Sequence, residues 1–97
     1  MENEEMVYMR KELEQQVSRG EAIQRLLKNK DFKQVILESY LKDTMIGLGH
    51  QMSTQHKPEI RQAISEQILA RGILQNFLNM MLDDANRAAT ELREIGA

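Results

Sequence analysis

The sequence predicts an all-α protein built from three helices. Glu, Gln, Lys, Arg, Leu, Ala and Met, which all favour helices, dominate its 97 residues. β-Branched residues are scattered singly, and no segment alternates with the period of two that a half-buried strand shows. Pro58 is the only proline and there are five glycines, so few positions suit tight turns. We therefore expect helices at about 2–28, 32–47 and 58–95, in an elongated antiparallel bundle or hairpin forming a single domain, 1–97.

The first helix carries a heptad pattern of the kind that packs along a seam. Spacings of three and four alternate along it, through Met6, Met9, Leu13, Gln16, Gly20, Ile23 and Leu27. Glycine in a helix interior costs about 1 kcal/mol relative to alanine. We therefore interpret Gly20 as a point where another helix packs closely, in preference to a kink.

The second helix is expected to follow a break at residues 29–31, with Asp31 as its N-cap and Gln34 completing a capping box. Its apolar stripe is wide, which indicates cover on more than one side. Gly47 and Gly49 predict the end of this helix, because glycine readily adopts the left-handed conformation at a helix C-terminus. The polar segment 48–57 is then expected to be an internal loop.

Pro58 predicts the start of the third helix, at a position where its missing N–H costs nothing. Apolar residues then recur at helical spacing, and Gln67 and Arg71 lie on the continuation of this stripe, where polar residues can fix a pairing register. A helix of about 38 residues extends about 57 Å, against about 22 Å for the second helix. The third helix therefore cannot bury its whole stripe within one chain.

This surplus of apolar surface predicts self-association or docking onto a larger partner. The first-helix seam and the end of the third helix are the surfaces expected to need that partner. The predicted interface residues are Met6, Met9, Leu13, Ile23, Leu27, Leu78, Met81, Leu92 and Ile95.

No motif for catalysis, cofactor binding or metal binding stands out. His50 and His56 match no common metal-ligand spacing, and the chain contains no cysteine to complete a site. Gly47-Leu48-Gly49-His50 lacks the preceding strand and the Lys-Ser/Thr pair of a phosphate-binding loop. No serine lies in a nucleophile elbow. We therefore expect a protein that is not an enzyme and has no cofactor.

One local basic cluster could contact phosphates. Its members are Arg25, Lys28, Lys30 and Lys33. Favourable charge at a helix C-terminus and a solvated turn explain it more simply. No aromatic residues interleave with it to stack on bases, and the net charge of -2 gives no strong attraction to nucleic acid or an anionic membrane. Weak nucleic-acid binding through this cluster is kept as an alternative.

The composition favours a reducing compartment, or stability that is gained by assembly. Small secreted domains usually need disulfides, and this chain has no cysteine. The acidic start, with Glu2, Glu4 and Glu5, does not fit the basic beginning of a signal peptide. No apolar stretch approaches the roughly 20 residues that span a membrane. We therefore expect a protein that is neither secreted nor in a membrane.

The segment 26–41, Leu-Leu-Lys-Asn-Lys-Asp-Phe-Lys-Gln-Val-Ile-Leu-Glu-Ser-Tyr-Leu, resembles a line in small helical proteins of tailed bacteriophages. Those proteins have a leading helix, a short break, an aromatic residue in the second helix and a long final helix. They are grouped with virion or head-assembly components and offer no catalytic residues to carry over.

The resemblance implies a structural or assembly protein of a phage, located in the host cytoplasm or the virion. Such a protein would act through helix-mediated self-association, in a coiled-coil or bundle arrangement, and through docking to other virion proteins. The alternative is a small regulator or inhibitor that binds a host protein.

Overall fold

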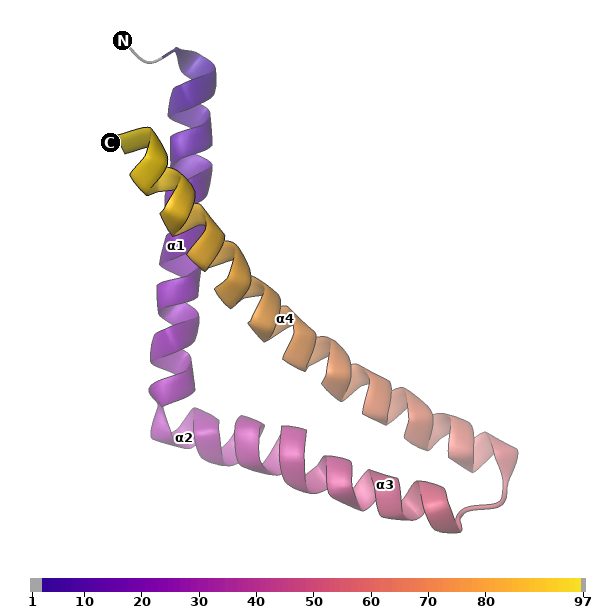
Figure 1. Cartoon of the computed structure of the whole chain (residues 1–97). Coiled ribbons are helices and arrows are strands. Elements are labelled where there is room, and N and C mark those ends of the chain that lie inside the picture. Colours follow the sequence, from indigo (N-terminus) through magenta and orange to yellow (C-terminus); the bar gives the residue numbers. More distant parts are fainter. Residues whose placement is uncertain (1–2, 97) are drawn as a thin grey trace. The chain divides into compact units, whose positions relative to one another are not determined.

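The computed structural model describes residues 3–96, and these residues are helical apart from short connections. The elements are α1 (Glu4–Lys28), α2 (Lys30–Phe32), η1 (Lys33–Asp43), α3 (Thr44–Thr54) and α4 (Pro58–Gly96) (Figure 1). Because α2, η1 and α3 follow one another without a gap, they correspond to the second predicted helix. No strand occurs in this described range, so the predicted all-α class is confirmed.

The chain divides into two compact units, where the sequence predicted a single domain. Unit 1 comprises Met1–Leu27 and Leu78–Ala97, and unit 2 comprises Lys28–Phe77. The long helix α4 is continuous through Gly72 and contributes to both units. Unit 1 therefore holds α1 and the C-terminal part of α4, and unit 2 holds α2, η1, α3 and the N-terminal part of α4.

Asparagine side chains cap two of the helices. The Oδ1 atom of Asn3 accepts a hydrogen bond from the backbone N–H of Met6 at 2.8 Å, at the start of α1. Asn29 is the N-cap of α2, and its Oδ1 accepts from the N–H of Phe32 at 3.0 Å. Both bonds satisfy an amide that has no partner inside its helix. The predicted cap at Asp31 is wrong. Asp31 lies in the first turn of α2, where its negative charge interacts favourably with the positive end of the helix dipole.

The helix then takes a wider winding in η1, a π-helix of 11 residues. At its end, the N–H of Thr44 donates to the carbonyl of Ser39, five residues back. The hydroxyl of Ser39 spans the same interval, donating to the carbonyl of Gln34 at 2.8 Å. A π-helix usually lasts one turn. The sequence pattern predicted a helix here but not its winding.

The second helical segment is longer than predicted, and the loop after it is shorter. Gly47 and Gly49 lie inside α3, with no positive φ, and α3 continues to Thr54. The predicted loop 48–57 is therefore reduced to residues 55–57. Arg61 of α4 links this connection to the end of α3. Its Nη1 donates to the carbonyls of Met52 at 2.5 Å and Gln55 at 3.0 Å.

Replacing Gly49 with alanine should stabilise the protein by about 0.5–1 kcal/mol, because alanine loses less conformational freedom in a helix. A Cβ built at Gly49 meets no atom within 4 Å, so no steric cost opposes this gain. Urea and thermal unfolding followed by circular dichroism measure the change. Gly49→Pro is the control, since proline in a helix interior costs about 3 kcal/mol but is tolerated in a loop. If neither Gly49→Ala nor Gly49→Pro changed the stability much, position 49 would not lie inside a helix.

The packed face of α4 follows a heptad repeat. Buried and half-buried side chains recur every seven residues, at Ile64, Arg71, Leu78, Ala85 and Leu92. A second row has the same spacing of seven and lies three residues further along the chain, at Leu74, Met81, Ala88 and Ile95. In unit 2 the most buried apolar side chains are Leu48 and Ile64. In unit 1 they are Leu13, Leu78, Ala85 and Ala88.

Candidate interaction surfaces

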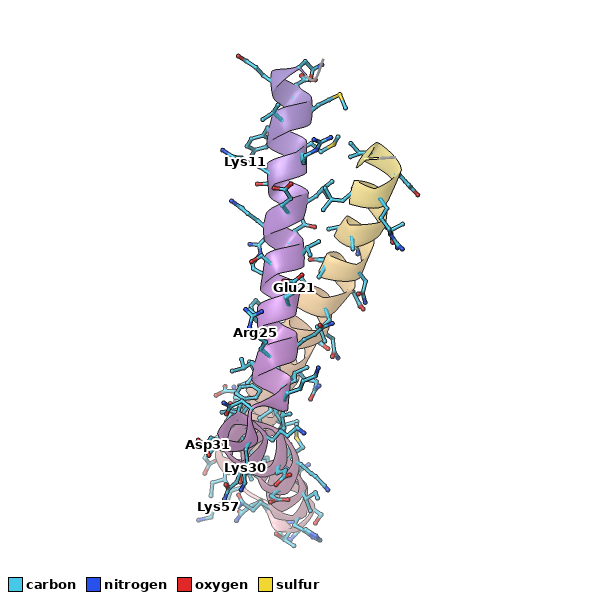
Figure 2. The ribbon with its side chains drawn as sticks, turned by 90° about the vertical axis from the view of Figure 1, so that its left-hand side faces the viewer. Lys11, Glu21, Arg25, Lys30, Asp31 and Lys57 are labelled. Carbon is cyan, nitrogen blue, oxygen red and sulfur yellow. The ribbon has the colours of Figure 1, made fainter. Side chains whose placement is uncertain are left out.

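Unit 1 contains a close helix packing between α1 and the C-terminal part of α4, which crosses α1 in Figure 1 and lies beside it in Figure 2. A Cβ placed on Gly20 would overlap the Cβ of Ala85 and would lie 3.6 Å from its Cα. Only a hydrogen at position 20 leaves room for this approach. The interpretation of Gly20 as a close-packing point is therefore confirmed.

The predicted interface residues fall into three groups by exposure. Leu13 and Leu78 are buried inside unit 1, so they serve packing within the chain and are withdrawn from the predicted interface. Met6 and Met9 are exposed. The remaining five are half-buried, namely Ile23, Leu27, Met81, Leu92 and Ile95. The first-helix seam therefore already has a partner inside the chain over its central part.

The first turns of α1 expose a group of apolar side chains. Met6, Val7, Tyr8 and Met9 are all exposed, Tyr8 to 67%. A shallow hollow of about 320 Å³ opens along Asn3, Glu4, Val7, Tyr8 and Lys11. All of its lining residues belong to the start of one helix, so the hollow has a single wall. This surface offers apolar contact area but does not enclose a small molecule.

A second apolar surface lies on α4, and we call it the outer stripe. It consists of Leu69, Ile73, Phe77 and Met80. The exposed fractions of Leu69, Ile73 and Phe77 are 64%, 60% and 50%. Spacings of four, four and three place these side chains in one row along the helix. Large apolar side chains that line up in water mark interaction sites more often than singly scattered ones.

The outer stripe lies on a different side of the helix from the packed face. At about 100° per residue, the stripe is centred roughly 145° from the heptad row of Ile64 and Leu78, and roughly 75° from the row of Leu74 and Met81. Polar and charged residues border it on α4, with Glu66 before Leu69, and Asp84 and Arg87 after Met80. Asp84 and Arg87 form a salt bridge at 3.3 Å. The sequence pattern contained this stripe, but periodicity alone did not separate it from the packed face.

Arg71 connects α4 to the π-helix within unit 2. Its Nε donates to the backbone carbonyl of Tyr40 at 3.1 Å and to the Oγ1 of Thr44 at 2.8 Å. Its guanidinium also lies over the Tyr40 ring, 4.2 Å from the centroid. Its Nη1 donates to the carbonyl of Gln67 at 2.9 Å. The sequence made Arg71 and Gln67 candidates for polar residues that fix a pairing register. The structure shows Arg71 in contact with Tyr40 and Thr44 of its own chain, whereas the side chain of Gln67 is exposed.

The carbonyl of Tyr40 receives two side-chain donors. It belongs to the last turn of η1, at whose end the N–H of Thr44 donates to the carbonyl of Ser39. The carbonyl of Tyr40 accepts from Arg71 at 3.1 Å and from the hydroxyl of Thr44 at 2.5 Å.

The four residues of the predicted basic cluster are all exposed. Arg25 belongs to unit 1, and Lys28, Lys30 and Lys33 belong to unit 2. Arg25 points away from the C-terminal part of α4 (Figure 2). Asp31 lies among the lysines in sequence and is also exposed. Their arrangement is that of solvated surface charges.

No three His, Cys, Asp or Glu residues among 3–96 are placed to hold a metal ion. His50 and His56 are exposed, the first in α3 and the second in the connection before α4.

Within the same residues, no helix combines the length and apolarity needed to cross a membrane.

Comparison with known proteins gives no match, whether with family models, with curated proteins or with solved structures.

Proposed function

We propose that this protein is a non-enzymatic structural or assembly protein of a phage, which acts by self-association and by docking to other virion proteins. The outer stripe of α4 carries the proposal. Fully burying a leucine, isoleucine or phenylalanine side chain is worth about 1.5–3 kcal/mol. Leu69, Ile73 and Phe77 are each half exposed or more, so a partner that covers them gains much of that energy.

The exposed start of α1 supports the same proposal from a different part of the chain. Met6 and Met9 belong to the interface predicted from the sequence, and both remain in solvent. Methionine adapts to irregular partner surfaces, which suits a protein that docks onto other components. Two apolar surfaces on one small chain favour a role in building assemblies. The resemblance of segment 26–41 to phage proteins favours a role in the virion or in its assembly.

The test of self-association compares the wild-type chain with a variant in which Leu69, Ile73 and Phe77 are all replaced by glutamine. We expect the wild type to form oligomers as its concentration rises and the variant to remain monomeric, because the variant has lost the apolar surface. Light scattering coupled to size-exclusion chromatography measures the mass, and circular dichroism verifies that helix content is kept. Gln75→Ala with Asn79→Ala is the matched control, since both residues are exposed and polar on the same helix.

The test of the biological role is mass spectrometry of purified phage particles and of assembly intermediates. We expect the chain in one of them at defined stoichiometry. A protein that stays monomeric at high concentration and is missing from particles and intermediates would refute the proposal. Capture of one stoichiometric host protein by such a monomer would identify it instead as a regulator.

A further inference from the structure

We propose that the outer stripe pairs with the outer stripe of a second copy of this chain, with the two α4 helices antiparallel about a two-fold axis beside Phe77. This inference rests on the self-association proposed above and specifies its geometry. All the residues that it uses lie on one continuous helix. The arrangement therefore depends on α4 alone.

Two opposite charges lie on the side of α4 that carries the outer stripe. Glu66 precedes Ile73 by seven positions, and Arg87 follows Met80 by seven. Seven residues are close to two turns at about 3.6 residues per turn, so both charges lie in line with the stripe. Each is exposed, and each lies beyond one end of the row from Leu69 to Met80.

These two charges favour one register of an antiparallel helix pair. When two identical helices run antiparallel about an axis between residues 76 and 77, Glu66 of one copy lies level with Arg87 of the other. The same pair forms again at the opposite end, because a two-fold interface repeats every contact. In this register Ile73 lies level with Met80 of the second copy, Phe77 lies beside the axis, and Leu69 lies level with Asp84. One alignment therefore matches both the centre of the apolar row and the charges at its ends.

A parallel pair would bring like charges together. With the same stripe in contact, Glu66 would lie opposite Glu66 and Arg87 opposite Arg87. Like charges across an interface disfavour that arrangement. Arg87 already bonds Asp84 of its own helix at 3.3 Å. In the antiparallel pair its guanidinium can bind two carboxylates, because it carries five N–H donors.

The size of this surface indicates a reversible dimer. A row of four apolar side chains, flanked by one ion pair at each end, is small beside the roughly 1,200–2,000 Å² that stable complexes bury. We therefore expect a monomer–dimer equilibrium that responds to protein concentration.

Disulfide trapping tests the direction of the pair. The chain contains no cysteine, so single-cysteine variants report on one position each. Under mild oxidation, a mixture of Ile73→Cys and Met80→Cys chains should form mainly the mixed 73–80 disulfide. Each variant alone should form little. A predominance of 73–73 and 80–80 disulfides would show parallel helices and overturn the proposal.

Charge reversal tests the register. Glu66→Arg and Arg87→Glu should each weaken self-association about tenfold, because each places like charges opposite one another at both ends. An equimolar mixture of the two variants should restore self-association, because a dimer of one copy of each has opposite charges facing one another at both ends. Glu21→Lys and Arg25→Glu are the matched controls, as both residues are exposed on α1 and labelled in Figure 2. Sedimentation velocity over a concentration series gives the dissociation constants.

The outcomes separate this inference from the proposed function. A wild-type chain that stays monomeric at every concentration overturns both. Self-association that persists, with no mixed disulfide and no response to the charge variants, overturns the antiparallel pair alone and leaves self-association standing. The mixed disulfide together with recovery in the mixture establishes the pair.

Discussion

The Gly20→Ala variant should unfold at a lower temperature than the Gly72→Ala variant, although both make the same chemical change inside a helix. Alanine favours a helix over glycine by about 1 kcal/mol. At position 72 a Cβ meets no atom within 4 Å, so that gain is kept. At position 20 the new Cβ overlaps the Cβ of Ala85. Ala85 has no rotamer to change, so α1 and α4 must move apart.

Overpacking of this kind costs about 1–3 kcal/mol. The two variants should therefore differ by that amount in free energy of unfolding, and by about 4–8 °C in Tm for each kcal/mol. A Gly20→Leu variant should enlarge the loss. Adding Ala85→Gly to Gly20→Ala should remove the overlap and recover much of the stability. Equal stability of the two alanine variants would show that the helices are not in close contact at position 20.

The Arg71→Met variant should lose about 2–3 kcal/mol of stability. Methionine keeps an unbranched apolar stem but donates no hydrogen bond. The carbonyl of Tyr40 loses a charged donor at 3.1 Å, and the stacking of the guanidinium on the Tyr40 ring is also lost. A hydrogen bond to a charged group is worth about 1.5–3 kcal/mol and a cation–π contact about 0.5–1 kcal/mol. Chemical denaturation monitored by circular dichroism measures the loss.

Two further variants show whether the Arg71 contacts are specific. Arg87→Met removes the same side chain from the same helix, but Arg87 is 69% exposed and its ion pair is with Asp84 three residues away, so we expect a loss of at most about 0.5 kcal/mol. Thr44→Val removes the hydroxyl that shares the Tyr40 carbonyl. Because Thr44 and Arg71 act on one acceptor, their effects should not add. Equal losses for Arg71→Met and Arg87→Met would contradict the role given to Arg71.

The helices were predictable from the sequence because local signals set them. Pro58 marks the start of α4, and the apolar repeat continues through Gly72 without a break. The end of the second helical segment was missed for a physical reason. Glycine permits a left-handed turn but does not require one, and Gly47 and Gly49 remain in ordinary helix. The choice of cap at Asn29 over Asp31 depends on where the first turn begins, which propensity does not resolve.

The interaction surfaces were less predictable, because exposure depends on which face meets another helix. The seam of α1 correctly marked an apolar face, yet Leu13 and Gly20 are covered by α4 from within the chain. The apolar residues of α4 formed one broad pattern in the sequence. Only the structure divides it into a packed face with Leu78 and an outer stripe with Ile73 and Phe77. The π-helix and its bond to Arg71 left no recognisable signal in the spacing.

The division of α4 between two units has a consequence for the order in which the chain folds during synthesis. Unit 2 is one uninterrupted stretch and is complete once residue 77 has left the ribosome. Unit 1 joins two distant stretches of the chain. The packing of Gly20 against Ala85 therefore cannot form until the residues from 78 onward have been synthesised. Contacts between residues so far apart in sequence form slowly. During that interval the α1 seam is uncovered, and the nascent chain is most open to chaperones and to premature association.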